Sequence, residues 1–178
     1  MREYLQHLVK HLALADGTAV TLRPIRPSDA EIEQKFVRNL SPEARYFRFM
    51  DMVRELSPRM LKHLTELDYD QHVGVIAVTP IEGGEVEIAV GRYVLMENGE
   101  DCEFAIVVAD DWQHRGIATE LVQILIRSAR EHGLKRMIGE VLASNRKMLD
   151  FVRRLGFTLA MDHNDPRQIR ATLHLQHA

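Results

Sequence analysis

The sequence predicts an α/β fold of the α+β type, in which a mixed sheet carries helices on both faces. Two observations predict it. Helical segments with clear start signals precede residues 73–109, where β-branched and apolar residues dominate. An amphipathic helix, a strand, a second helix and two more strands then follow in alternation. With 178 residues, the chain is long enough to form one domain around a single core.

The N-terminal residues 1–15 are expected to form a short amphipathic helix. Four apolar side chains recur at the spacing of one helical face: Leu5, Leu8, Val9 and Leu12. Charged and histidine residues interrupt the segment, which argues against a targeting peptide. No stretch approaches the roughly 18 apolar residues that a membrane span needs. We therefore expect residues 16–178 to form a single domain that does not contact a membrane.

The remaining elements follow from turn and cap signals. A strand over residues 19–23 ends at Pro24, and Ser28-Asp29 can cap a helix that runs to about residue 39. Ser41-Pro42 and Ser57-Pro58 each open a further helical segment. The later strands are expected at residues 73–79, 87–96, 104–109, 137–142, 157–161 and 170–175, and the later helices at residues 116–131 and 145–155.

The composition excludes several classes of function. Lys and Arg number 23 against 26 Asp and Glu, so the formal net charge is -3 and nucleic acid is not an expected partner. Cys102 is the single cysteine, which excludes an intrachain disulfide and a CxxC zinc site and favours the reducing cytoplasm. His7 and His11 have i, i+4 spacing, but no third ligand accompanies them locally, so we expect no metal.

Residues 112–119 join an apolar strand to the helix at residues 116–131. The first N–H groups of a helix lack internal partners, and the helix dipole is positive at that end. Gly116 and Ala118 keep side-chain bulk away from the backbone, and Arg115 adds positive charge. This segment is therefore predicted to bind an anion such as a diphosphate.

Two motifs extend this interpretation to a family. The pattern Gln113-x-x-Gly116-x-Ala118 resembles the acetyl-CoA signature of GNAT acetyltransferases. Asn145, at the start of a helix that ends in Leu155-Gly156-Phe157, resembles the second cofactor segment of that family. The resemblance implies a GNAT fold, with a mostly antiparallel sheet of about six to seven strands, and acetyl-CoA as cofactor.

Several phrases are similar, more narrowly, to bacterial protein-lysine acetyltransferases that modify acyl-CoA synthetases. They are Thr21–Ala30, Leu40–Tyr46, Leu64–Tyr69 and Cys102–Val108. Members of that group often carry a large synthetase-like or nucleotide-binding domain, which is absent from these 178 residues. The resemblance implies acetyl transfer to a protein lysine. The alternatives are a small amine, such as a polyamine, amino acid or aminoglycoside, and an acetyl-CoA sensor without catalysis.

The resemblance also implies roles for individual residues. The backbone of Ile106, Val107 and Val108 would bind the pantetheine arm, and Asn145 would contact the cofactor near its thioester. The amides that would hold the diphosphate are those of Gln113, His114, Arg115, Gly116, Ile117, Ala118 and Thr119. Many family members use a tyrosine of the last helix to protonate the leaving thiolate, but Val152 stands at that position.

A general base is expected because a lysine amine has a pKa of about 10.4, so its deprotonation near neutral pH costs about 4 kcal/mol. Glu103, at the start of the central strand, is the first candidate and matches the catalytic glutamate of the similar acetyltransferases. Glu140 on the neighbouring strand is the second. Cys102 could carry the acetyl group, although a lone cysteine beside a central strand is more often packed in the core.

The acceptor is expected to contact the helical segment before the sheet, where Tyr46 and Phe47 lie between arginines, and the acidic and aromatic pair Asp68 and Tyr69. The opposite interpretation, in which the aromatic residues are core and the charges are surface, stays open. The apolar face of residues 5–12 and the final strand could each pack against a second subunit, which would give a homodimer.

Overall fold

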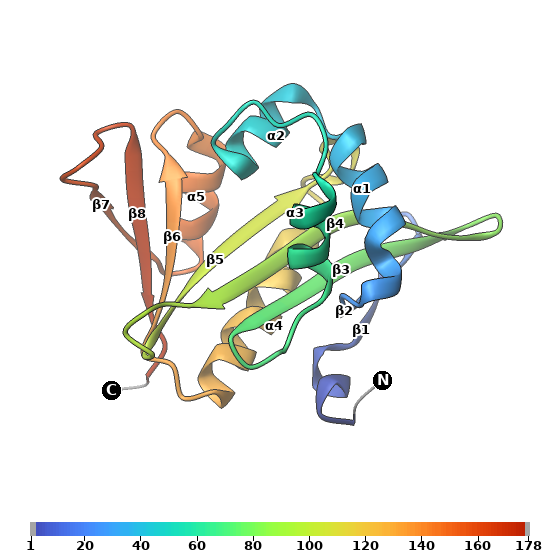
Figure 1. Cartoon of the computed structure of the whole chain (residues 1–178), viewed down its shortest axis with the longest axis horizontal. Helices are drawn as coiled ribbons and strands as arrows, with labels where there is room; N and C mark the ends of the chain where they lie inside the picture. Colours follow the sequence, from blue (N-terminus) through green and yellow to red (C-terminus); the bar gives the residue numbers. More distant parts are fainter. Residues whose placement is uncertain (1–2, 177–178) are drawn as a thin grey trace.

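The computed structural model describes residues 3–176, which form one eight-stranded sheet with helices on both faces (Figure 1). The strand order is β1-β2-β3-β4-β5-β6-β8-β7. All neighbouring strands run antiparallel except β5 and β6, which are parallel. The predicted mixed, mostly antiparallel sheet is therefore confirmed, with eight strands in place of six to seven.

The element bounds agree closely with the predicted order from residue 19 onward. The strands are β1 (Lys10–Ala13), β2 (Ala19–Pro24), β3 (His72–Ile81), β4 (Gly84–Leu95), β5 (Asp101–Val108), β6 (Arg136–Leu142), β7 (Thr158–Met161) and β8 (Gln168–His174). The α-helices are α1 (Ala30–Asn39), α2 (Pro42–Phe49), α3 (Pro58–Thr65), α4 (Ile117–Glu131) and α5 (Arg146–Arg154). Short 3-10 helices cover Glu3–Leu8, Pro27–Asp29 and Asp110–Trp112.

The predicted N-terminal helix at residues 1–15 is wrong over the part of it that the structure describes, which begins at Glu3. A 3-10 helix over Glu3–Leu8 leads directly into β1, which pairs with β2 and supplies the eighth strand. Leu5 and Leu8 are buried in the main core. The apolar spacing was real, but ladder bonds to β2 decide the conformation of residues 10–13. The burial of these side chains within the chain uses the face that was expected to reach a second subunit. The final strand, β8, was also expected to reach a second subunit, but it lies between β6 and β7.

Helices α2, α3 and α5 begin where the sequence places a cap. The Ser41 hydroxyl accepts a hydrogen bond from Ala44 N at 3.1 Å, and the Ser57 hydroxyl accepts one from Met60 N at 3.2 Å. Asn145 caps α5 in the same way, through Met148 N at 3.2 Å. Proline at the first helical position of α2 and α3 fits because that N–H has no helical partner.

The sheet separates two hydrophobic clusters. Helices α4 and α5 pack behind it in the view of Figure 1, while α1 and α3 cross its front. The side chains of alternate β5 residues pack on opposite faces of the sheet. Phe104 and Ile106 belong to the cluster with α4, and Val107 belongs to the cluster with α1. This alternation makes β5 the central strand and determines which of its side chains face which helices.

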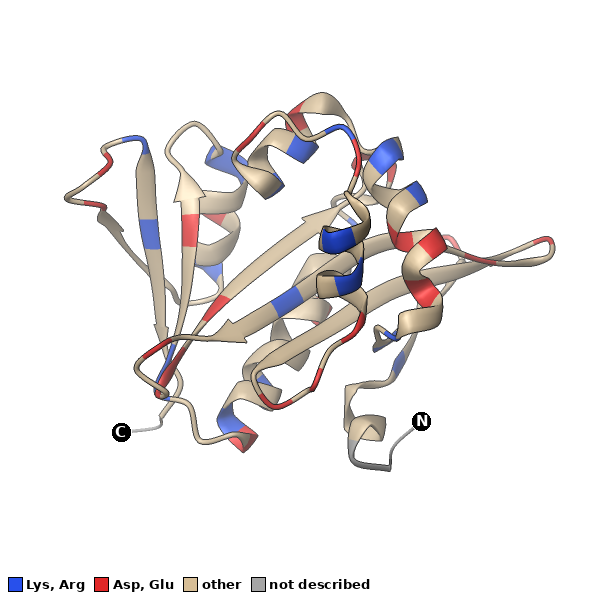
Figure 2. Ribbon diagram, viewed as in Figure 1, with Lys and Arg blue, Asp and Glu red and all other residues tan. Residues whose placement is uncertain are grey.

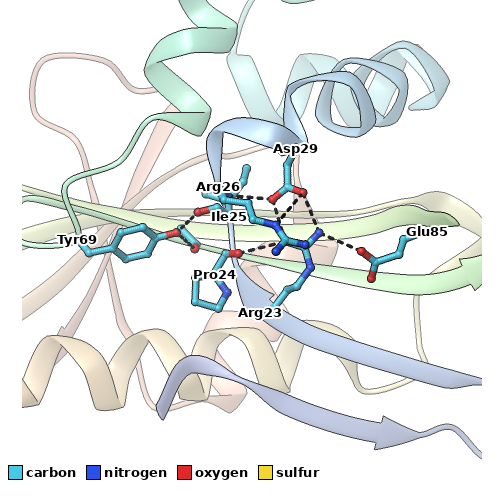
Figure 3. Close-up of polar contacts among 8 residues, drawn as sticks. Arg23, Pro24, Ile25, Arg26, Asp29, Tyr69 and Glu85 are labelled. Atoms are coloured by element: carbon cyan, nitrogen blue, oxygen red, sulfur yellow. Dashed lines mark hydrogen bonds and ion pairs between the residues drawn. The ribbon is translucent and has the colours of Figure 1, made fainter. Parts of the chain in front are cut away.

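A closed polar cluster joins β2 to the start of α1 (Figure 3). Arg23 is buried and donates two 2.8 Å hydrogen bonds to the Asp29 carboxylate, with a third at 3.2 Å to Glu85. Asp29 was expected to cap α1, but its carboxylate instead accepts from Arg26 N at 2.9 Å. Tyr69 closes the same turn through the carbonyl groups of Ile25 and Gly74.

A second buried cluster lies between α1, β3 and β4. Arg92 donates to Glu33 at 3.2 Å and to the Leu64 carbonyl at 2.9 Å, and it lies 3.5 Å from the His72 ring. Glu87 is also buried there. Burial, followed by the neighbouring Glu33 carboxylate, raises the pKa of Glu87 well above its usual range.

Charges of both signs are spread over the helices, the loops and several strands (Figure 2). Within residues 3–176, no helix is long and apolar enough to cross a membrane. The same residues contain no group of three or more potential metal ligands.

Candidate active site

The parallel strands β5 and β6 separate after a short stretch of pairing. They are in register only at Asp101–Glu103 with Arg136–Ile138, whereas β5 stays paired with β4 up to Val108. The β5 backbone after Glu103 therefore has one edge without a ladder partner. A cavity of about 580 Å³ lies at this opening, lined by β5, β6, α2, α5 and the start of α4.

Phe104 and Gly139 shape the floor of this opening. The Phe104 ring contacts the Phe157 ring, with a centroid separation of 5.1 Å, and approaches the β6 backbone at Gly139. A Cβ atom at position 139 would lie 2.5 Å from the Phe104 ring. The ring can occupy the space between the strands only because residue 139 is glycine, so the two residues together support the opening.

The loop after β5 presents the N-terminus of α4 to the cavity. His114 and Gly116 both adopt a left-handed backbone, with φ of 62° and 84°, and Gly116 is the N-cap of α4. No side chain caps this helix, unlike α2, α3 and α5. Gln113 fixes the loop, because its amide donates to the Val108 carbonyl at 3.2 Å. The first N–H groups of α4 are thus left available to an anion from outside the chain.

Glu103 lies in the same cavity, and its carboxylate has no hydrogen-bonding or ion-pairing partner among residues 3–176. Burial raises its pKa above the usual value, and the nearby Glu140 carboxylate raises it further. Arg170 and Arg48 act in the opposite direction. The result is a free carboxylate with increased basicity inside a cavity.

Glu140 occupies a different electrostatic position, although it lines the same cavity. It stands opposite Arg170 in the β6–β8 register and accepts a 2.7 Å hydrogen bond from that guanidinium. Glu103 pairs with Ile138, two residues before Glu140, so the two carboxylates share a face of the sheet. One is neutralised by an arginine and the other is free.

The acetyltransferase (GNAT) domain family matches residues 19–158 of this chain. The chain belongs to the GNAT acetyltransferase family. It is an acyl-CoA-dependent N-acetyltransferase, and the resemblance noted in the sequence is confirmed.

Similar proteins support the same assignment over most of the chain. Acetyltransferase PA5475 of Pseudomonas aeruginosa is 36% identical over 157 residues, which are 88% of this chain and 84% of that protein. Acetyltransferase Pat of Mycolicibacterium smegmatis is 38% identical over 136 residues, 76% of this chain but 40% of the longer relative. The crystal structure of the GNAT domain of S. lividans PAT superposes with a TM-score of 0.87 at 30% identity, covering 97% of this chain and 99% of that one.

Most residues predicted to hold the cofactor line the cavity of this GNAT domain. They are Ile106, Val107, Val108, Gln113, His114, Gly116, Ile117, Ala118, Thr119 and Asn145. Arg115 does not line it. Its guanidinium stacks on Trp112, 4.9 Å from the ring centroid, and pairs with Asp16 at 3.2 Å. The loop backbone therefore borders the cavity, whereas the charge of Arg115 is directed toward the β1–β2 turn.

Of the four predicted acceptor residues, Phe47 alone lines the cavity. Tyr46 is 40% exposed and lies outside it. The prediction for Asp68 and Tyr69 is corrected by their contacts. The Asp68 carboxylate accepts hydrogen bonds from Asp70 N, Gln71 N and His72 N, and Tyr69 is buried against the turn after β2. Both residues hold a turn in place and neither reaches the cavity.

Two further side chains are directed away from the chemistry. Cys102 is buried in the core behind the sheet, and burial raises its pKa to about 12, so it is no candidate for a thioester intermediate. Val152, at the position of the tyrosine found in many relatives, is also buried in that core. The neighbouring Phe151 faces the cavity in its place.

Sequence reasoning missed several residues that line the cavity. Helix α5 contributes Lys147, Phe151 and Arg154, which share one helical face at i, i+4 and i+7. This spacing was available in the sequence once Asn145 marked the helix start. No local signal pointed to Gln168 of β8 or Met50 after α2, because only the tertiary fold brings them to the cavity.

Proposed function

We propose that this chain transfers an acetyl group from acetyl-CoA to a lysine side chain of a protein, with Glu103 as general base. The observation that carries the proposal is the presence, in one cavity, of an uncapped helix N-terminus and a carboxylate without a partner. The helix N-terminus can bind the diphosphate of the cofactor, and the carboxylate can accept the proton of an amine.

The cofactor would lie along the open edge of β5. Its diphosphate would accept hydrogen bonds from the amides of residues 114–119, because the Gln113 N–H already donates to the Asp110 carbonyl at 3.3 Å. Its pantetheine arm would pair with the open edge of the β5 backbone at Ile106, Val107 and Val108. Asn145, whose side-chain oxygen already accepts from Met148 N, would offer its amide nitrogen near the thioester. This direction places the thioester toward Glu103, where β5 and β6 begin to separate.

Transfer proceeds by direct attack. The amine proton passes to the Glu103 carboxylate, the amine nitrogen bonds to the thioester carbonyl carbon, and the carbon–sulfur bond breaks to release the CoA thiolate. A raised pKa makes Glu103 a stronger base near neutral pH. Val152 and Phe151 cannot donate a proton, so the thiolate takes its proton from another group or from water.

The acceptor class is supported by the resemblance of several phrases of the sequence to bacterial protein-lysine acetyltransferases. Mass spectrometry of a lysate incubated with the protein and isotopically marked acetyl-CoA tests it. Labelled lysines on a limited set of proteins are the expected result.

Labelled small amines with unlabelled proteins would instead favour the small-molecule alternative. No label in either fraction, despite CoA binding, would favour an acetyl-CoA sensor. The proteins that carry the label would identify the acceptor directly.

A further inference from the structure

Arg48 differs from the other arginines held against the sheet. Arg23 and Arg92 each donate to a carboxylate, at 2.8 Å and 3.2 Å. Arg48 on α2 is half-buried, yet within residues 3–176 its guanidinium makes no hydrogen bond or ion pair. Its charge instead lies 4.9 Å from the centroid of the Phe49 ring. Five N–H donors are therefore left to whatever enters the cavity that Arg48 lines.

The charges around Arg48 do not neutralise it. Burial, followed by the positive charge of Arg92, lowers the pKa of Arg48 to about 10. The carboxylates of Glu33 and Glu103 act in the opposite direction without offsetting that loss. The guanidinium still carries its charge at neutral pH, and it does so without an ion pair to any residue between 3 and 176.

The diphosphate of a bound CoA is not the missing partner. Arg48 lies close enough to Glu103 for their charges to interact, and Glu103 stands near the start of β5. Strands rise about 3.4 Å per residue, so Val108, where the diphosphate loop begins, lies roughly 17 Å farther along. Arg48 is therefore at the reacting end of the cavity.

We propose that Arg48 binds a carboxylate at the reacting end of the cavity. A guanidinium offers two parallel N–H groups that match the two oxygens of a carboxylate. This carboxylate has two sources: the free end of a dicarboxylic acyl group on CoA, or a carboxylate beside the amine of the acceptor. The acceptor source rests on the proposed transfer to an amine, whereas the acyl source requires that a CoA thioester binds in the proposed direction, with the thioester toward Glu103.

Calorimetric titration tests the acyl source, with acetyl-CoA and succinyl-CoA as probes. We expect succinyl-CoA to bind at least about tenfold more tightly than acetyl-CoA if this source is correct, because a charge-assisted hydrogen bond contributes that much or more. The ratio of the two Kd values should fall to near one in Arg48→Gln. Arg59→Gln is the matched control, because Arg59 is exposed on α3 outside the cavity and loses the same charge.

Acetylation kinetics test the acceptor source. Pairs of lysine peptides that differ by Glu against Gln beside the lysine are compared by kcat/KM. At least about tenfold preference for the Glu peptide is expected in the wild type and in Arg59→Gln, with loss of the preference in Arg48→Gln. Arg48→Lys keeps the charge without the planar fork and should retain only part of it.

A preference for the carboxylate in only one of the two experiments, the titration or the kinetics, identifies the source of that carboxylate. The proposal is wrong if the wild type prefers the carboxylate in neither arm, a result that does not depend on whether any variant folds. It is also wrong if a folded Arg48→Gln keeps the wild-type ratio. Failure of the proposed transfer would look different, because no peptide would be acetylated although CoA thioesters bind.

Discussion

Arg23 and Glu103 lie in two regions that differ in whether their charged groups are paired. Around Arg23, a guanidinium and the Asp29 carboxylate meet through two 2.8 Å hydrogen bonds, and both are buried. Around Glu103, a carboxylate and the Arg48 guanidinium face a cavity with no bond to each other or to any described residue. Charged groups that pair with each other within the chain stabilise the fold, and charged groups without a partner are available to bind substrates.

Glu103→Gln should give the largest effect. The amide keeps the size of the side chain but cannot take the amine proton, so kcat should fall roughly 10²- to 10⁴-fold. Acetyl transfer is followed by thiol release at saturating substrates. Thermal unfolding of the same variant checks that the loss is chemical, since a carboxylate without partners contributes little to the fold. A decrease of less than about threefold in kcat would remove Glu103 from the mechanism.

Asp29→Asn changes the region of paired charges and should lower the stability of the fold. It leaves the buried Arg23 charge without its partner, which costs about 3–5 kcal/mol of unfolding free energy. Glu85→Gln is the matched control, because Glu85 contacts the same guanidinium but is 41% exposed and should cost less than about 1 kcal/mol. Urea denaturation measures both. Equal losses in the two variants would mean that burial does not distinguish these ion pairs.

His72 should make the protein sensitive to acid. Burial, followed by Arg92, lowers its pKa to about 4, against about 6.5 in the unfolded chain. The unfolded state then binds more protons below pH 6.5, so stability falls as the pH drops from 6.5 to 4, by up to about 3 kcal/mol.

Denaturant midpoints across this range should vary less with pH in His72→Gln than in the wild type. His11→Gln, at an exposed position, is the control and should keep the wild-type dependence. Identical pH dependence in all three proteins would refute a buried neutral His72.

Gly116→Ala should have the smallest effect. Together with a glycine variant outside the site, it compares backbone strain inside the site with backbone strain elsewhere. A left-handed alanine costs about 1–2 kcal/mol, which should weaken CoA binding by up to roughly thirtyfold if the loop shifts to relieve it. Gly99→Ala introduces similar strain, at φ 69°, in the turn before β5 and away from the cavity. Calorimetry should show weaker CoA binding for the first variant alone.

The sequence was most informative where function depends on local backbone. Gly116 and Asn145 could be placed because a helix start is specified within a few residues. Residues 10–13 could not, because their strand exists only through pairing with β2. Tyr69 was misassigned because an aromatic residue between two aspartates resembles a cation site, whereas tertiary contacts with Ile25 and Gly74 bury it.

Electrostatic roles were the least predictable. Glu103 and Glu140 are both strand glutamates in sequence. They differ because the Arg170 guanidinium of β8 donates a hydrogen bond to Glu140 and none to Glu103. That difference depends on a strand pairing between residues thirty positions apart in the chain. The unpaired state of Arg48 likewise depends on the charged groups that three other elements, α1, β4 and β5, place around it.

The pH dependence of kcat/KM in wild type and Glu103→Gln tests the central claim most directly. A base must be deprotonated to act, so the wild-type rate should rise with pH through the raised pKa of Glu103 and then level off or merge with the titration of the amine. The account predicts that this acidic limb disappears in Glu103→Gln while a low residual rate remains. An acidic limb of the same position and steepness in both proteins would contradict it.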